Sequence, residues 1–357
     1  MKQNILNIAR RFKLIGEPKN AEPYGGGHIN DTYLLDTDSA RYILQRVNTN
    51  VFTRPVELME NIVNVTAFLR DAISRNGGNP ARETLTFIPA LDGSYYLDSP
   101  DEGFWRCYIY VDDALTYQQA TEELFYESAR ALGRFQMLLD GYPASGLHEV
   151  IADFHNTSKR FETFLDAYNS NPCGRVESAR EEIRFVMDRK DEMGLITSAI
   201  ESGRLPLRVA HNDTKLNNIL IDAATGRGLC VLDLDTVMPG SALYDFGDSV
   251  RFGAGTALED EPDVSKMKLS LPLYEAFVKG YLECAALSAD EHAMLSWGAK
   301  LMTLECGMRF LTDYLMGDKY FKTSRPGHNL DRCRTQFALA ADMERHWDEM
   351  AAIARKY

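Results

Sequence analysis

The most constraining feature of this sequence is a pair of short apolar runs with polar, potentially metal-binding residues at their outer ends. The first run, 219–221, follows the segment VAHNDTKLNN (209–218), and the second, 229–232, leads directly into Asp233. Between them lies DAATGRG, which is typical of turns, so we expect the two runs to pair as a β-hairpin. Asn218 and Asp233 would then lie roughly 5 Å apart across its open end. The spacing therefore predicts a site for one shared cation.

The residue types in this segment are those that phosphoryl transfer requires. The reaction needs an acceptor hydroxyl held in line with the γ-phosphate and a cationic clamp on the triphosphate. Asp213 supplies a carboxylate that can accept the hydroxyl proton, and Asn218 supplies a hard oxygen that suits Mg²⁺. Lys215, between them, can meet phosphate charge, and Asp233 can bind the metal. Each residue alone would fit a polar turn, but the spaced set beside a hairpin favours a kinase.

Two further acidic residues follow. Asp235 would lie on the same strand face as Asp233, where it could be another metal ligand or could orient its neighbours. The sequence leaves both roles open. Asp245, in LYDFGD, we interpret as a structural residue that orients the catalytic loop.

Composition excludes several classes of function. The 357 residues carry a net charge of −13, which argues against a nucleic-acid partner, whereas ATP is compatible because Mg²⁺ accompanies it. The six cysteines are scattered, without the spacing of a disulfide framework or a zinc site. The sequence shows no signal peptide and no membrane span, so we expect a cytoplasmic protein. We also expect a monomer whose partners are small molecules.

The pattern of His211, Asp213, Lys215 and Asn218, with Asp233 downstream, resembles the H-x-D-x-x-x-x-N loop and metal-binding Asp of protein kinases and their small-molecule relatives. It is similar to the aminoglycoside phosphotransferase and choline kinase group. Within that group, the motifs YGGGHIN, HNDTKLNNIL, LDTVMPGSALYDFGDSVRFGA and ECGMRFLTDYL resemble kinases that act on N-acetylhexosamines, nearly end to end. The resemblance implies Mg²⁺-dependent transfer of the ATP γ-phosphate to the anomeric hydroxyl of such a sugar. We therefore expect the small-molecule partners to be this sugar and a nucleotide.

The resemblance also implies an α+β, protein-kinase-like fold with an antiparallel-sheet lobe before a mainly helical lobe. We place the boundary near residue 113, which divides the chain into 1–113 and 114–357. Apolar periodicity predicts the following elements: a helix at 54–74, strands at 85–88, 95–97 and 105–111, and helices at 122–139, 177–202, 274–283 and 291–314.

The nucleotide site departs from the kinase pattern. Gly25, Gly26 and Gly27 lie between two predicted strands and suit a loop that covers phosphates. Protein kinases place a phosphate-binding lysine on the next strand, but here Gln45 stands at that position with Arg46 beside it. Adjacent strand residues point to opposite faces, so only one of the two can face the nucleotide. The phosphate clamp is left open by the sequence.

Four residues are candidates for acceptor binding: His28 and Asn30 after the glycines, and Arg309 and Tyr320 near the carboxyl end. Arg309 on an apolar helix needs either a polar ligand or a helical ion pair with Glu305 or Asp313, and the resemblance to sugar kinases favours the ligand. Two other functions stay open. One is a kinase for a different hydroxylated acceptor, such as an aminoglycoside, choline or another sugar, and the other is a catalytically silent nucleotide-binding regulator.

Overall fold

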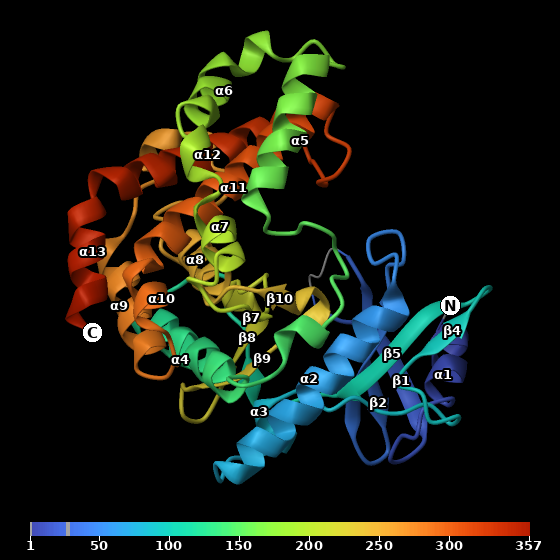
Figure 1. Cartoon of the computed structure of the whole chain (residues 1–357). Coiled ribbons are helices and arrows are strands. Elements are labelled where there is room, and N and C mark those ends of the chain that lie inside the picture. Colours follow the sequence, from blue (N-terminus) through green and yellow to red (C-terminus); the bar gives the residue numbers. More distant parts are fainter. Residues whose placement is uncertain (1, 26–28) are drawn as a thin grey trace.

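The computed structural model describes residues 2–25 and 29–357. A five-stranded antiparallel sheet with strand order β1-β2-β3-β5-β4 comes first in the chain, and a mainly helical part follows (Figure 1). The elements of the sheet region are α1 (Lys2–Ala9), β1 (Pro18–Pro23), β2 (Asp31–Thr37), β3 (Arg41–Val47), α2 (Pro55–Arg75), α3 (Pro80–Glu83), β4 (Leu97–Ser99) and β5 (Gly103–Ile109).

The helical part contains three more short β-pairings besides its helices. Its elements are β6 (Ala114–Leu115), α4 (Glu122–Leu138), α5 (Thr157–Ser170), α6 (Arg180–Met187), α7 (Leu195–Glu201), β7 (Arg208–Ala210), β8 (Ile219–Asp222), β9 (Gly228–Val231), β10 (Met238–Gly240), α8 (Ala242–Gly253), α9 (Leu271–Leu282), α10 (Ala289–Ala293), α11 (Leu295–Met316), α12 (His328–Arg345) and α13 (Trp347–Lys356). None of the helices described in residues 2–25 and 29–357 is long and apolar enough to cross a membrane.

The sheet buries both of its faces, and strand alternation decides which residue faces which neighbour. On one face Leu44 and Trp105 pack with α1. On the other face Val47 and Phe104 pack with α2, which lies across the sheet on the side of the helical part (Figure 1). The face covered by α2 is also the one from which Arg106 reaches Asp235 in the helical part.

Most predicted elements are present, with four differences. The strand predicted at 95–97 lies at Leu97–Ser99, and the helix predicted at 291–314 is interrupted at Met294, between α10 and α11. The helix predicted at 177–202 is broken into α6 and α7 by a 3₁₀ turn and Gly194, because glycine is costly inside a helix. The segment 85–88 runs beside β5 with one isolated bridge but forms no strand. Pro89 follows it directly and has no N–H to continue a ladder.

The connection between the two regions is anchored to the hairpin of the helical part. β6 pairs antiparallel with β8, with Ala114 opposite Asp222. The boundary expected at residue 113 lies in this connection, and the division into domains 1–113 and 114–357 remains a proposal.

Helices α8 and α11 cross at two glycines. A Cβ atom added at Gly247 would lie 2.2 Å from the backbone oxygen of Gly298, and one added at Gly298 would lie 2.7 Å from the backbone oxygen of Leu243. Backbone atoms cannot rotate away as a side chain can, so neither position has room for a larger residue. This crossing sets the distance between the helix that carries Asp245 and the helix that carries Arg309.

We predict that Gly247→Ala lowers the free energy of unfolding by about 1–3 kcal/mol, because the added methyl group forces the two helices apart. Gly146→Ala is the matched control, since a Cβ atom there meets no heavy atom within 4 Å. Urea unfolding of both variants measures the difference. Equal stability of the two variants would show that the helix crossing is looser than described.

Candidate active site

The predicted hairpin is formed by β8 and β9, which pair antiparallel. Beyond the last strand pair, the N–H of Leu232 donates to the carbonyl of Asn218 at 2.7 Å. Asn218 and the residue after Leu232, Asp233, therefore lie at the open end of the hairpin, as expected. The catalytic loop, which we define as residues 211–218, enters the hairpin at this end.

Two carboxylates of α8 hold the backbone of the catalytic loop. Asp245 accepts hydrogen bonds from the N–H groups of His211 (2.9 Å) and Asn212 (2.7 Å), and Asp248 accepts one from the N–H of Thr214 (2.9 Å). Burial raises the pKa of Asp245, and the hydrogen bonds from the N–H groups of His211 and Asn212 oppose that rise. The structural role inferred for Asp245 agrees with these contacts.

His211 joins the catalytic loop to the hairpin. Its ring is fully buried, with Nε2 2.7 Å from the carbonyl oxygen of Leu232 and Nδ1 3.2 Å from the N–H of Asp213. The first contact requires a donor and the second requires an acceptor, so together they select the neutral tautomer with its proton on Nε2. This pair of hydrogen bonds positions Asp213 relative to the metal candidates.

The carboxylate of Asp213 lies beside two other predicted site residues. Lys215 Nζ is 2.7 Å from Oδ1, and Asn218 Nδ2 donates to the backbone carbonyl (2.8 Å) and to Oδ2 (3.3 Å). Burial disfavours the charged form of Lys215, but Asp213 and Asp248 outweigh it and the pKa of Lys215 is raised. Asp213 keeps 27% of its side chain exposed, which leaves it accessible to a substrate hydroxyl.

The geometry after β9 corrects one expectation. Asp233 has a left-handed backbone (φ 56°), and the chain turns there into a 3₁₀ helix, η5 (Leu234–Thr236). Asp235 therefore does not continue the strand on the same face as Asp233, because the left-handed residue ends the strand. The Asp233 side chain is exposed. Desolvation by the protein around it, followed by repulsion from Asp235 and Asp213, raises the pKa of Asp233 to about 7.

Asp235 is buried and held by two groups from the N-terminal sheet region. Arg106 Nη1 lies 2.5 Å from Oδ1, and Asn30 Nδ2 donates to Oδ2 at 2.7 Å. Asn30 also accepts a hydrogen bond from the N–H of Asn48 (3.0 Å). Asn30, which the sequence suggested as a contact for the acceptor substrate, thus lies beside Asp235, a predicted metal ligand. The metal-binding role of Asp235 remains a prediction.

Gln45 and Arg46, the two candidates on β3, point to opposite faces of the sheet, as expected for adjacent strand residues. Gln45 lies opposite Arg106 on β5 and accepts a hydrogen bond from its Nε at 2.9 Å, so it faces the catalytic loop. Arg46 is exposed on the opposite face, beside Gly103. Gly25 is exposed with a φ of 75°, and Gly26, Gly27 and His28 lie outside the described residues.

Arg309 does not form the helical ion pairs considered from the sequence. Glu305 pairs with His155, and Asp313 accepts hydrogen bonds from the backbone of 319–321. In the part of the chain that the structure describes, neither carboxylate lies within ion-pair distance of Arg309. Its guanidinium instead lies 5.1 Å from the centre of the Phe154 ring.

A second arginine, which the sequence did not suggest, lies near this one. Arg160 donates two hydrogen bonds to the carbonyl of Phe154 (3.0 and 3.1 Å), and burial together with the charge of Arg309 lowers its pKa. Tyr320 lies nearby, 65% exposed, with its ring against Phe321. The surface beside α11 therefore presents two cations and two aromatic rings to a polar ligand.

A buried ion pair connects this surface to the catalytic loop. His155 Nδ1 lies 2.7 Å from Glu305, and Nε2 donates to the carbonyl of Asn212 at 3.0 Å. Thr157 donates to the same carboxylate. The sequence alone does not indicate this pair, because the partners are 150 residues apart and a histidine in a loop carries no signal of its own.

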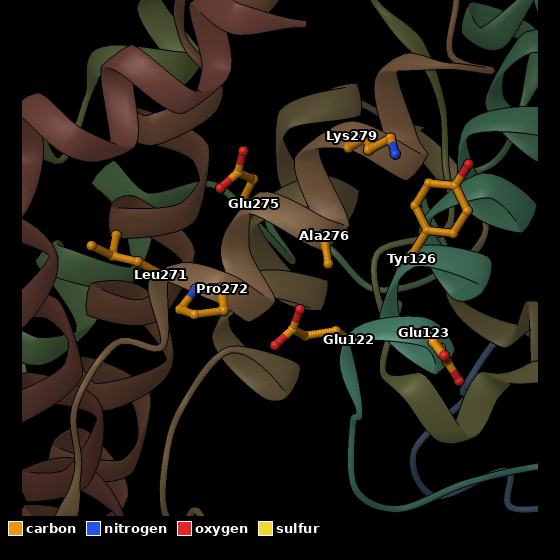
Figure 2. A pocket seen from close by; sticks show the side chains of 8 residues that line it. All are labelled: Glu122, Glu123, Tyr126, Leu271, Pro272, Glu275, Ala276 and Lys279. Carbon is orange, nitrogen blue, oxygen red and sulfur yellow. The ribbon is translucent and has the colours of Figure 1, made fainter.

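A surface pocket of about 540 Å³ lies elsewhere, between α4 and α9 (Figure 2). Its lining includes Glu122, Glu275 and the ring of Tyr126, which Lys279 overlies at 5.3 Å. No residue of the catalytic loop lines it, so it is separate from the candidate site.

Comparisons with known proteins agree with this arrangement. The family model described as "Phosphotransferase enzyme family" matches residues 20–281. Similar solved structures include a microcompartment-associated aminopropanol kinase (18% identity, 98% of each chain, TM-score 0.62) and a spectinomycin phosphotransferase in complex with ADP and spectinomycin (14% identity, 96% of this chain and 98% of that one, TM-score 0.62). An amicoumacin kinase in complex with AMP-PNP and Ca²⁺ is 15% identical over 99% of this chain and 93% of that one, with a TM-score of 0.59. At these identities the likeness concerns the fold, and it confirms the predicted protein-kinase-like arrangement.

The pair of His155 and Glu305 predicts a pH-dependent stability. Burial opposes charge on His155, but Glu305 outweighs it and raises the pKa above the ordinary 6.5, so this contribution is complete below 6.5 and is lost as the pH rises through the folded-state pKa. Burial likewise opposes charge on Glu305, but His155 outweighs it and lowers the pKa below 4.5, so that contribution is present above 4.5 and is lost as the pH falls through the folded-state pKa.

We therefore expect His155→Gln to lower the free energy of unfolding most between about pH 5 and 6.5, by about 1.5–3 kcal/mol, with a smaller deficit at pH 9. His292→Gln is the control, because the His292 ring contacts the carbonyl of Ala354 and has no carboxylate partner among the described residues. Thermal unfolding across pH measures both variants. A deficit for His155→Gln that does not change with pH would contradict the charged pair.

Proposed function

The chain belongs to the phosphotransferase enzyme family, whose model matches residues 20–281, and from this membership we propose that it is a Mg²⁺-dependent kinase that transfers the ATP γ-phosphate to the anomeric hydroxyl of an N-acetylhexosamine. The observation that carries the proposal is the convergence of Asp213, Lys215 and Asn218 at the open end of a hairpin that leads into Asp233. The proximity of a carboxylate, a lysine and an amide beside a second acid is what supports phosphoryl transfer here.

In the proposed reaction Asp213 orients the acceptor hydroxyl and takes its proton as the new oxygen–phosphorus bond forms. Lys215 and Asn218 hold the two carboxylate oxygens at 2.7 and 3.3 Å, which limits rotation of the side chain. Lys215 is also the nearby cation available to an incoming phosphate oxygen. Asp245 holds the loop that carries these groups by accepting hydrogen bonds from the N–H groups of His211 and Asn212.

The residues present fit a magnesium ion. Asn218 donates through Nδ2 to Asp213, which leaves its Oδ1 available as a ligand, and the Asp233 carboxylate is exposed beside other acids. Within residues 2–25 and 29–357 no group of three or more His, Cys, Asp or Glu is arranged to hold a metal. Mg²⁺ commonly takes one or two protein oxygens and completes its shell with phosphates and water. The ion supplies charge neutralisation at the phosphates, and Asn218 and Asp233 would hold it, with Asp235 as a further candidate.

The structural neighbours support a nucleotide co-substrate. One carries ADP and another carries AMP-PNP with Ca²⁺. We propose ATP for this chain, bound beside the catalytic loop with Gln45 on the wall of the site, and the role of Gly25, Gly26 and Gly27 remains a prediction.

The acceptor assignment rests on the N-acetylhexosamine kinase motifs and on the surface beside α11. Arg309 and Tyr320 offer a guanidinium and an exposed phenol, and neither is paired with a carboxylate in the described part of the chain. A sugar with hydroxyl and acetamido groups can accept hydrogen bonds from the first and stack on the second. His28, which the motif GGGHIN suggests as another sugar contact, remains a prediction.

The direct test is incubation of the protein with ATP, Mg²⁺ and a panel of acceptors, followed by mass and NMR identification of the product. The panel holds N-acetylglucosamine, N-acetylgalactosamine, glucose, choline, aminopropanol and an aminoglycoside. A 1-phosphate of an N-acetylhexosamine supports the proposal. Phosphorylation of another member would keep the kinase and replace the acceptor, and ATP binding without turnover of any member would favour a silent regulator.

We predict that Asp213→Asn lowers kcat by about 10²- to 10⁴-fold, because it removes the proton acceptor. The Kd for ADP should stay close to the wild-type value, since Asp213 is not a proposed nucleotide contact. Asp188→Asn, at an exposed carboxylate on the surface, is the control. Near wild-type turnover of Asp213→Asn would remove this residue from the catalytic step.

Arg309→Ala tests the acceptor surface. Loss of one charged hydrogen bond should lower kcat/KM for the sugar by roughly ten- to a hundredfold and leave the KM for ATP unchanged. The control is Arg332→Ala, which removes an arginine that lies over the Phe310 ring, 5.4 Å from its centre. If both KM values rise together with a fall in Tm, Arg309 is a structural residue and the acceptor lies elsewhere.

A further inference from the structure

The charge that a kinase needs at its nucleotide phosphates is absent from the usual strand position. Gln45 on β3 is neutral, and both ends of its amide are used: Nε2 donates to the hydroxyl of Thr32 (3.0 Å), and Oε1 accepts from Arg106 Nε (2.9 Å). Gln45 therefore acts as a support for Arg106 and cannot carry the phosphate charge itself.

Arg106 stands where its side chain can supply that charge. It lies directly opposite Gln45 in the antiparallel register, and directly opposed residues project from the same face of the sheet. That face is the one turned toward the catalytic loop. Nη1 of the Arg106 guanidinium lies 2.5 Å from Asp235 Oδ1. Asp235 follows the proposed metal ligand Asp233 by two residues.

Resting on the nucleotide-dependent kinase proposed above, we propose that Arg106 is a second phosphate-binding cation besides Lys215, the counterpart on β5 of the lysine that β3 lacks. The strand lysine of protein kinases is held by a carboxylate from another element and reaches the α- and β-phosphates. The pair of Arg106 and Asp235 has the same composition, a cation on the sheet held by an acid beside the metal site.

The bonding of Arg106 leaves donors for a phosphate. The side chain is only 3% exposed, Nη1 lies 2.5 Å from Asp235 Oδ1, and Nε donates to Gln45, whereas Nη2 has no acceptor among the described residues. A guanidinium has five N–H donors in a planar fork that matches two phosphate oxygens. Arg106 can therefore keep Asp235 as its counter-ion and still donate to a diphosphate.

This arrangement gives Asp235 a positioning role and leaves the metal to Asn218 and Asp233. Asn30 donates to the second oxygen of Asp235, so the carboxylate is held on both sides by groups from the sheet region. The ligand class follows from the chemistry: Arg106 distinguishes a nucleoside di- or triphosphate from a nucleoside.

Calorimetric titration with ADP and with adenosine, both in the presence of EDTA, tests the inference without metal binding or turnover. For Arg106→Gln we expect the Kd for ADP to rise about ten- to a hundredfold, with the Kd for adenosine unchanged. Arg106→Gln alone leaves the buried carboxylate of Asp235 without its counter-ion. The double variant Arg106→Gln with Asp235→Asn is therefore measured as well. It replaces the ion pair with two amides and should show the same selective loss.

A second double variant moves the positive side chain from β5 to β3. Gln45→Lys combined with Arg106→Gln returns a lysine to β3, and it should recover most of the lost affinity for ADP. Arg11→Gln removes another arginine–carboxylate pair of the same region, with Glu102, and should leave both Kd values unchanged.

An unchanged Kd for ADP in the double variant would overturn the assignment, and so would an equal loss for ADP and adenosine, which would show a purely structural role. A wild-type protein that binds neither ligand would instead refute the nucleotide dependence proposed above. The two failures are therefore distinguishable.

Discussion

The structure depends on a carboxylate that takes no part in the chemistry. Asp245 accepts two backbone hydrogen bonds from the residues that precede Asp213, and Asn212 among them has a left-handed backbone. A non-glycine residue in that conformation is strained and persists only where its surroundings hold it. Asp245 on α8 and His155 on the far side provide that hold through the N–H and the carbonyl of the same residue, Asn212. The position of the proposed base is thus determined by two buried charges behind it.

Local sequence was sufficient where chemistry and spacing are local. The hairpin, the proximity of Asp213, Lys215 and Asn218, and the α2 and α4 helices all follow from patterns within about twenty residues. Asp235 was misplaced because a single left-handed residue, Asp233, ends the strand, and a strand pattern gives no sign of such a turn. The interruption between α6 and α7 had a local signal in Gly194, but the apolar periodicity continues across it.

Contacts between distant segments could not be predicted in this way. Arg106 meets Gln45 only through strand register, and it meets Asp235 across 129 residues of chain. One signal was available, since a charged residue inside the apolar run WRCYIY must find a buried partner. Its identity required the fold. Arg160 is a similar case, because it resembles an ordinary helix residue in the sequence and only the fold brings it near Arg309.

The glycine crossing of α8 and α11 has a consequence for how such an enzyme diversifies. With backbone against backbone at Gly247 and Gly298, the helix that carries Arg309 and the helix that carries Asp245 behave as one rigid unit. On the proposed acceptor surface, new preferences would then arise by exchange of side chains on the outer turns of α11, since a shift of the helix itself would displace the segment 211–218. Side chains on α11 could therefore change during evolution without moving the backbone that positions Asp213.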